Sequence, residues 1–192
     1  MIRYYFFGFR FLAIVGCLFL AIPQVLNAGV REEAEGVIRD FFPDAKSIEF
    51  QALALQNDAR TVAEQTAGQA FLLDKLYYWE IRSGESILGY AVLDNVKGKA
   101  HPITYLVLFS SELKVQRVRV IRYREQIGGA IQEPRWLEQF RGRDRHSGFD
   151  PGRHIDGISG ATISVNAISR GVQRITVYLS QLANNTVAAD ME

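Results

Sequence analysis

Cysteine is almost absent from this chain of 192 residues. The only one, Cys17, lies in an apolar stretch near the N-terminus. The part that follows therefore cannot form a disulfide, a cysteine-rich zinc site or a catalytic thiol. A folded domain without cysteine is compatible with an oxidising compartment.

An excess of basic charge is also missing. Residues 1–28 contain two arginines and no acid, so 20 basic and 21 acidic side chains remain after them, a net charge of about −1. This balance argues against a nucleic-acid-binding protein, which normally has a basic excess or a basic stripe. The local exception is a cluster of arginines that forms either a solvated loop or a contact with an anion. Its members are Arg141, Arg143, Arg145 and Arg153.

Histidine is scarce as well, and the three present do not have the spacing of metal ligands. They are His101, His146 and His154, and with no helical or Cys/His pattern among them we expect no metal site.

The long apolar run of the chain lies at its N-terminus. Two arginines precede or interrupt this region, an apolar segment spans residues 11–22, and small residues follow at Ala28. This is the layout of a secretory signal cleaved near Ala28, with an uncleaved membrane anchor or a lipid attached to Cys17 as alternatives. In each case residues 1–28 are a targeting segment, and the domain is exported to the periplasm or the outer face of the cytoplasmic membrane.

The rest of the chain predicts one α+β domain over residues 30–183, an antiparallel meander sheet packed by N- and C-terminal helices. A helix is expected from Val30 until Pro43 stops it. A weaker helical pattern, capped by Asp58, covers residues 58–67. Strands are expected at 46–55, 76–82, 86–96, 103–109 and 114–122, and a short helix at 133–140. In the last strand, Val118 and Val120 share one face while Arg117 and Arg119 take the other.

The final helix has one continuous apolar stripe. Its members recur every three or four residues: Val165, Ile168, Val172, Ile175, Leu179 and Leu182. Ser164 is the expected N-cap and Asn184–Asn185 the expected end, leaving residues 184–192 as a tail. Thr162 then lies immediately before a helix N-terminus, where unpaired N–H groups and the helix dipole favour a phosphate.

Residues 156–164, Asp-Gly-Ile-Ser-Gly-Ala-Thr-Ile-Ser, form a small-residue turn at that point. Gly160 and Ala161 leave room for a bulky partner to approach the Thr162 hydroxyl. By composition alone, a structural turn that caps the helix is the favoured interpretation. Around Ser159 the segment lacks only the last glycine of a Gly-x-Ser-x-Gly nucleophile elbow, but no histidine follows Ser159, which excludes a hydrolase triad in that order.

The same segment resembles the flavinylation motif of the FMN-binding domain family. That family includes the C subunit of the sodium-pumping NADH:quinone reductase and the G subunit of the Rnf complex. Its motif is Asp, two residues, Ser or Thr, then Gly-Ala-Thr, and every defined position is matched by Asp156, Ser159, Gly160, Ala161 and Thr162. The resemblance implies that Thr162 carries FMN through a phosphoester, which a flavin transferase installs from FAD.

The likeness extends over most of residues 30–183, through Phe42-Pro43-Asp44-Ala45 and Trp136-Leu137-Glu138-Gln139-Phe140. Rnf-type members have a Glu-Thr-Pro-Gly-Leu-Gly-like segment where this chain has residues 124–130, which pairs Glu125 with their glutamate and indicates a stand-alone relative. The implied cofactor site comprises Thr162, Asp156, Ser159, Gly160, Ala161, Ser164, Glu125 and Trp136. Tyr123, Trp79 and Trp136 are candidates either for stacking on the flavin or for the core. Arg135, Arg141 and Arg153 are candidates for its phosphate.

The resemblance therefore implies an exported flavoprotein electron carrier with covalent FMN. Its partners would be the transferase and redox proteins close to the membrane, quinone-linked or cytochrome-like. No catalytic acid or base for a small substrate is visible, so an electron-transfer protein is favoured over a stand-alone enzyme. The alternative is a non-redox binding or sensory module that keeps the FMN-binding fold.

Overall fold

The computed structural model describes residues 22–189; within them, the side chains of residues 22–28 and 184–189 are not described. Most of the expected targeting segment, residues 1–28, thus lies outside the described part. No helix within the described part is long and apolar enough to cross a membrane.

Five antiparallel strands form a single sheet in chain order, β1-β2-β3-β4-β5. They span Ser47–Ala54 (β1), Lys75–Ser83 (β2), Ser86–Lys97 (β3), Pro102–Ser110 (β4) and Val115–Arg122 (β5). The α+β meander predicted from the sequence is confirmed, with strand ends within two residues of expectation. β4 is buried from Ile103 to Phe109 because it lies inside the sheet and both of its faces are covered.

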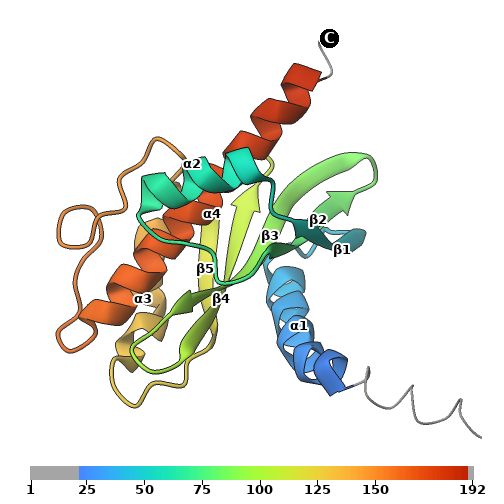
Figure 1. The fold of residues 1–192 in the computed structure, drawn as a ribbon. Helices are drawn as coiled ribbons and strands as arrows, with labels where there is room; N and C mark the ends of the chain where they lie inside the picture. The colour runs from blue at the N-terminus through green and yellow to red at the C-terminus, as the bar shows by residue number, and fades with distance from the viewer. Residues whose placement is uncertain (1–21, 190–192) are drawn as a thin grey trace, which may run out of the picture.

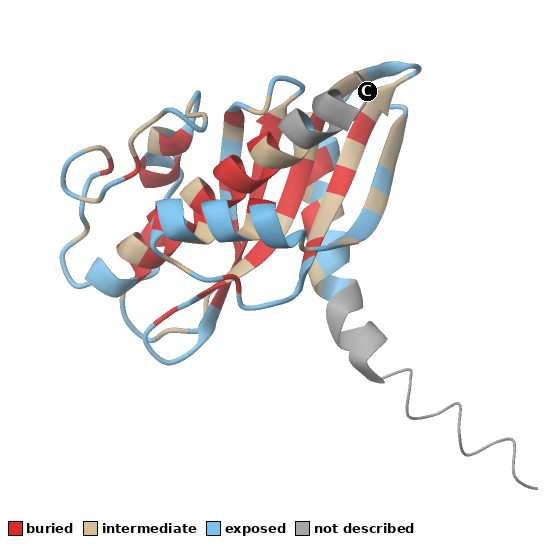
Figure 2. Ribbon diagram, turned by 45° about the horizontal axis from the view of Figure 1, so that its top comes forward, coloured by how far each residue is buried: buried red, intermediate tan, exposed pale blue. Residues whose placement is uncertain are grey.

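One face of the sheet is covered by α4 (Thr162–Ala189), and α2 (Asn57–Ala67) lies beside α4 (Figure 1). The expected stripe of α4 is buried from Val165 to Leu179 and packs on Val92, Val107 and Val118 of the strands. Ala59, Ala63 and Ala67 form the buried side of α2, and such small side chains let the two helices approach closely. Figure 2 shows that the outer side of α2 is exposed.

The opposite face is covered by α1 (Ile22–Phe41). Ala34 and Ile38 of α1 are fully buried against Trp79, Ile81 and Leu106. The sheet therefore separates two hydrophobic cores, with Val118 and Val120 in one and exposed Arg117 and Arg119 on the other face, as the alternation predicts.

Several helix ends differ from the sequence prediction. The N-cap of α2 is Gln56, so Asp58 lies in the first turn rather than capping it. Ser164 is likewise wrong as a cap, because α4 begins at Thr162. The predicted end at Asn184–Asn185 is also wrong, since Asn is tolerated inside a helix and α4 continues to Ala189. The short helix after the sheet divides into α3 (Pro134–Leu137) and a 3₁₀ turn, η2 (Glu138–Phe140), preceded by another 3₁₀ turn, η1 (Gly129–Gln132).

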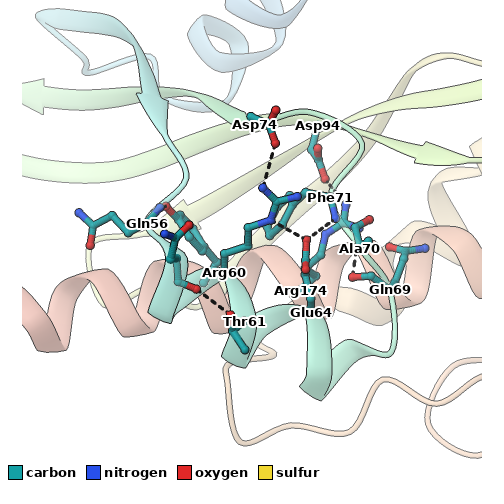
Figure 3. Close-up of polar contacts among 12 residues, drawn as sticks. Gln56, Arg60, Thr61, Glu64, Gln69, Ala70, Phe71, Asp74, Asp94 and Arg174 are labelled. Carbon is teal, nitrogen blue, oxygen red and sulfur yellow. Dashed lines mark hydrogen bonds and ion pairs between the residues drawn. The ribbon is translucent and has the colours of Figure 1, made fainter.

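A buried ion pair connects α4 to the sheet and to the loop before β2 (Figure 3). Arg174 is fully buried, and its Nη2 donates to Asp94 Oδ2 over 2.6 Å. Tyr105 donates its hydroxyl to the same oxygen over 3.0 Å, and Arg174 Nη1 donates to the Ala70 carbonyl. Burial, and then the Asp94 charge, raise the pKa of Tyr105 well above its usual range, so its proton stays in this contact.

Candidate functional site

A cavity of about 690 Å³ lies between the start of α4 and the segments that follow β3 and β5. One wall is residues 160–164, and the other comes from residues 99–101 and 124–127. Binding sites for small molecules and cofactors usually have volumes of roughly 300–1,000 Å³. The meander topology brings residues 99–101 close to residues 124–127, because the β3–β4 turn and the end of β5 lie at the same end of the sheet.

Thr162 is the first residue of α4, is exposed, and lines the cavity. Its carbonyl accepts a bond from Asn166 Nδ2 over 2.8 Å, but its hydroxyl makes no hydrogen bond with the described part of the chain. The Ala161 carbonyl accepts the Val165 N–H over 2.9 Å, the first bond of the helix. The N–H groups of residues 162–164 are left without a partner among the described residues, as at any helix start, and they can bind an anion.

The turn before Thr162 leaves its hydroxyl approachable. Gly160 has a φ of +78°, a conformation that side chains disfavour, and a Cβ there would meet only Ile127, at 4.0 Å. Ala161 is buried, and its N–H bonds to the Ile158 carbonyl over 3.0 Å. The tight turn and the open space beside it come from this Gly-Ala pair.

Tyr123 joins the two walls of the cavity. Its hydroxyl donates to the Ile127 carbonyl over 2.5 Å and lies 3.2 Å from Ser164 Oγ. Gly128, with a φ of +91°, packs so closely that a Cβ would come within 2.7 Å of the Tyr123 hydroxyl and 3.2 Å of Ala161 Cβ. Tyr123 therefore positions the loop, and Ser164 is buried as its partner inside the first turn of α4.

Glu125 lines the cavity and also holds the turn opposite Thr162. Its Oε1 accepts the N–H groups of Ala100 over 2.8 Å and His101 over 3.0 Å. These two bonds lower the pKa of Glu125 below its ordinary value, because they stabilise the carboxylate, and the bond from His101 has the larger effect. The residue that the resemblance selected is thus an ionised group that shapes the β3–β4 turn.

The remaining predicted site residues lie near the cavity but do not form its lining. Trp136 is buried, meets Phe140 edge to face, and donates its indole N–H to the Asp156 carbonyl over 2.8 Å. Gln139 Oε1 accepts the Asp156 N–H over 2.8 Å, and Ser159 is exposed in the turn. Through its bond to Asp156, Trp136 thereby helps to position the motif, residues 156–162. Trp79, another stacking candidate, is buried in the core on the α1 side of the sheet.

Two cations that line the cavity were not singled out from the sequence. Lys99 and Arg124 belong to the lining, whereas Arg135, Arg141 and Arg153 do not. The available signals were that Arg124 precedes Glu125 and that Lys99 lies in the short link between two predicted strands. Among the described residues, no group of His, Cys, Asp or Glu is arranged to hold a metal ion.

Comparison with known proteins addresses the identity of this site. Residues 98–176 match the model of the FMN-binding domain. Over this segment the chain is similar to the FMN-binding domain. The matched segment includes both cavity walls and all of residues 156–164.

A solved structure has a fold similar to that of this chain. NqrC of Shewanella oneidensis superimposes with a TM-score of 0.50 at 18% sequence identity, over 76% of this chain and 88% of that one. None of the curated proteins compared with the chain matches it.

The cavity fits the cofactor that the family name implies. The three N–H groups at the start of α4 that have no partner within the described structure suit a phosphate, and Gly160 leaves space beside Thr162 for a bulky group. Ile127 and Ile163, which are 72% and 51% exposed, add apolar surface beside it for a planar ring. In this domain, residues 160–164 would hold the phosphate end, and residues 99–101 and 124–127 would face the rest of the cofactor.

Proposed function

We propose that this protein is an exported electron carrier with FMN joined to Thr162 through a phosphoester. The observation that carries the proposal is the position of the Thr162 hydroxyl, exposed in the 690 Å³ cavity and free of hydrogen bonds within the described residues. The match of residues 98–176 to the FMN-binding domain supports the identity of the cofactor. Bound FMN supplies the redox chemistry, and the protein supplies attachment, orientation and electrostatics.

Attachment needs an enzyme, because the described structure places no base beside the Thr162 hydroxyl. In the reaction proposed, a flavin transferase takes the proton from Oγ, which bonds to the phosphorus on the flavin side of FAD. The pyrophosphate bond breaks and AMP leaves. The N–H groups of residues 162–164 bind the resulting phosphodiester, and Asn166 holds the Thr162 carbonyl.

The electron partners proposed are a donor and an acceptor close to the membrane, quinone-linked or cytochrome-like. The secretory layout of residues 1–28 supports export to the periplasm or to the outer face of the cytoplasmic membrane. Covalent attachment suits that compartment, since a dissociated flavin would be lost from it. The alternative function, a non-redox binding module, predicts that the cavity never acquires a covalent flavin.

Flavin that survives denaturation tests the attachment. Protein co-produced with a flavin transferase in an exporting host should keep flavin fluorescence in denaturing gels, and peptide mass spectrometry should place the adduct on Thr162. Thr162→Ala should abolish both signals, and Thr66→Ala, a change on the exposed side of α2, should leave them intact. A colourless wild-type protein under these conditions would favour the binding module.

Intact mass tests export in the same preparation. Mature protein from a membrane-plus-periplasm extract should lack about the first 28 residues or keep them as an anchor, and it should carry the mass of FMN. Recovery of the whole flavin-bearing pool from the cytoplasm would contradict the proposed location.

A further inference from the structure

The ionisable side chains of the cavity all belong to one wall. Lys99, His101, Arg124 and Glu125 lie on the segments that follow β3 and β5, while residues 160–164 contribute no ionisable side chain. That second wall instead presents the N-terminus of α4, which carries partial positive charge. The Glu125 carboxylate is therefore the one negative group among the lining residues.

This negative group is engaged within the protein. Glu125 Oε1 accepts the N–H groups of Ala100 and His101, so its charge is partly compensated by the turn that it holds. Lys99 and Arg124 are in the opposite situation. Their side chains make no hydrogen bond or ion pair with the described residues, in contrast to Arg60 and Arg82, which are paired with acids. Two uncompensated cations thus face whatever the cavity contains.

We propose that Lys99 and Arg124 raise the reduction potential of the bound flavin, an inference that rests on the proposed function. Reduction takes up two electrons and one proton at N5, FMN + 2e⁻ + H⁺ → FMNH⁻, which leaves one negative charge on the ring system. A fixed positive charge nearby stabilises this product more than the neutral oxidised ring, so the equilibrium moves towards reduction. The electrons come from a reduced partner protein or, in the test, from dithionite.

The expected size is modest, because both side chains are exposed and water screens them. Each cation should change the equilibrium constant of reduction by up to about tenfold, which equals about 30 mV for a two-electron couple. The effect should also weaken between about 0.01 and about 1 M salt, as the Debye length falls from about 30 to about 3 Å.

Spectroelectrochemical titration of the flavin-loaded full chain tests this role. Lys99→Gln and Arg124→Gln should each lower the midpoint potential, and the double variant should lower it by the larger amount. Lys99→Arg and Arg124→Lys keep the charge and should restore most of the wild-type value. Arg119→Gln, which removes an exposed cation on the other face of the sheet, is the matched control and should change nothing.

Intact mass and ferricyanide oxidation separate the possible failures. If the double variant is fully loaded and its potential equals that of the wild type at low salt, the proposal is wrong. An unchanged potential with a slower reaction towards anionic ferricyanide would mean that the cations attract partners instead, which also overturns it. Absence of flavin from the wild-type protein would refute the proposed function itself, a result that mass alone reveals.

Discussion

At the scale of single residues, the effect of losing the buried charged pair of Arg174 and Asp94 can be predicted. Arg174→Met should lower the free energy of unfolding by about 3–5 kcal/mol, because the Asp94 carboxylate stays buried without its partner. Urea denaturation followed by circular dichroism measures this. The pair itself need not be strongly stabilising, since Arg174 Nε has no hydrogen-bond partner within the described structure.

Two further variants separate this cause from general damage to α4. Adding Asp94→Asn to Arg174→Met removes the unpaired charge, so the double variant should lose less than the two single losses combined. Arg170→Met on the same helix changes an exposed residue with one long bond to Gly68, and its effect should stay within about 0.5 kcal/mol. Equal losses for Arg170 and Arg174 would contradict the explanation.

The lowered pKa of Glu125 leads to a prediction about how the β3–β4 turn responds to pH. Bonds from His101 and Ala100 lower its pKa, so the stabilisation it contributes is fully present above its ordinary value of 4.5 and is lost as pH falls through the lowered value. The amide proton shifts of these two residues should therefore titrate below pH 4.5 in the wild type. Glu125→Gln should remove that titration, and persistence of the titration in the variant would assign it to another acid.

The residue scale also shows what could be predicted from the sequence. Thr162 was predicted to lie at a helix start from the stripe beginning at Val165, because periodicity locates helices well. Lys99 and Arg124 were missed as members of one site, since they are far apart in the chain and only the pairing of β3, β4 and β5 brings them together. Trp136 was chosen as a flavin contact, and only the fold reveals its bond to the Asp156 carbonyl.

At the scale of elements, the loop between β5 and η1 depends on one glycine. Gly128→Ala should lower the free energy of unfolding by about 1–3 kcal/mol, because φ is +91° and the added Cβ would lie 2.7 Å from the Tyr123 hydroxyl. Moving this loop also shifts Ile127 at the cavity, so covalent flavin loading should fall. Chemical denaturation and the ratio of flavin to protein absorbance measure the two effects.

The neighbouring glycine is a close control. At Gly129 the backbone has no positive φ, and an added Cβ would meet only the end of the Gln132 side chain, at 3.7 Å. Gly129→Ala should leave both stability and loading almost unchanged. Similar losses at both positions would mean that the segment tolerates no side chain, and the role given to Tyr123 and Ala161 would be wrong.

Element ends were the least predictable part of the fold, for a physical reason. The sequence indicated all five strands, but cap residues were assigned by preference alone: Asp58 and Ser164 are good caps, yet the helices begin at Asn57 and Thr162. A residue caps a helix only where the backbone turns, and that position depends here on how the Gly160–Ala161 turn packs against Gly128.

At the scale of the whole molecule, we expect the sheet to depend for its stability on the helices that cover its two faces, α4 on one and α1 on the other. The core on the α1 side joins Ala34 and Ile38 to Trp79 and Leu106, and the described α1 side chains that pack there begin at Val30. Removal of a targeting segment up to Ala28 would therefore leave these contacts in place. The predicted cleavage and the fold are consistent with each other in this respect, although α1 itself begins at Ile22.

A chain beginning at Gly29 keeps these contacts and serves as the reference. A chain beginning at Asp44 lacks α1, exposes Trp79 and Leu106, and should aggregate or lose several kcal/mol, since burial contributes roughly 25 cal/mol per Å² of apolar surface. Denaturant midpoints and light scattering compare the two. Ile38→Ala in the Gly29 chain should cost about 2–5 kcal/mol; a neutral result there would show that α1 does not pack on the sheet in solution, and that the second core is not needed for stability.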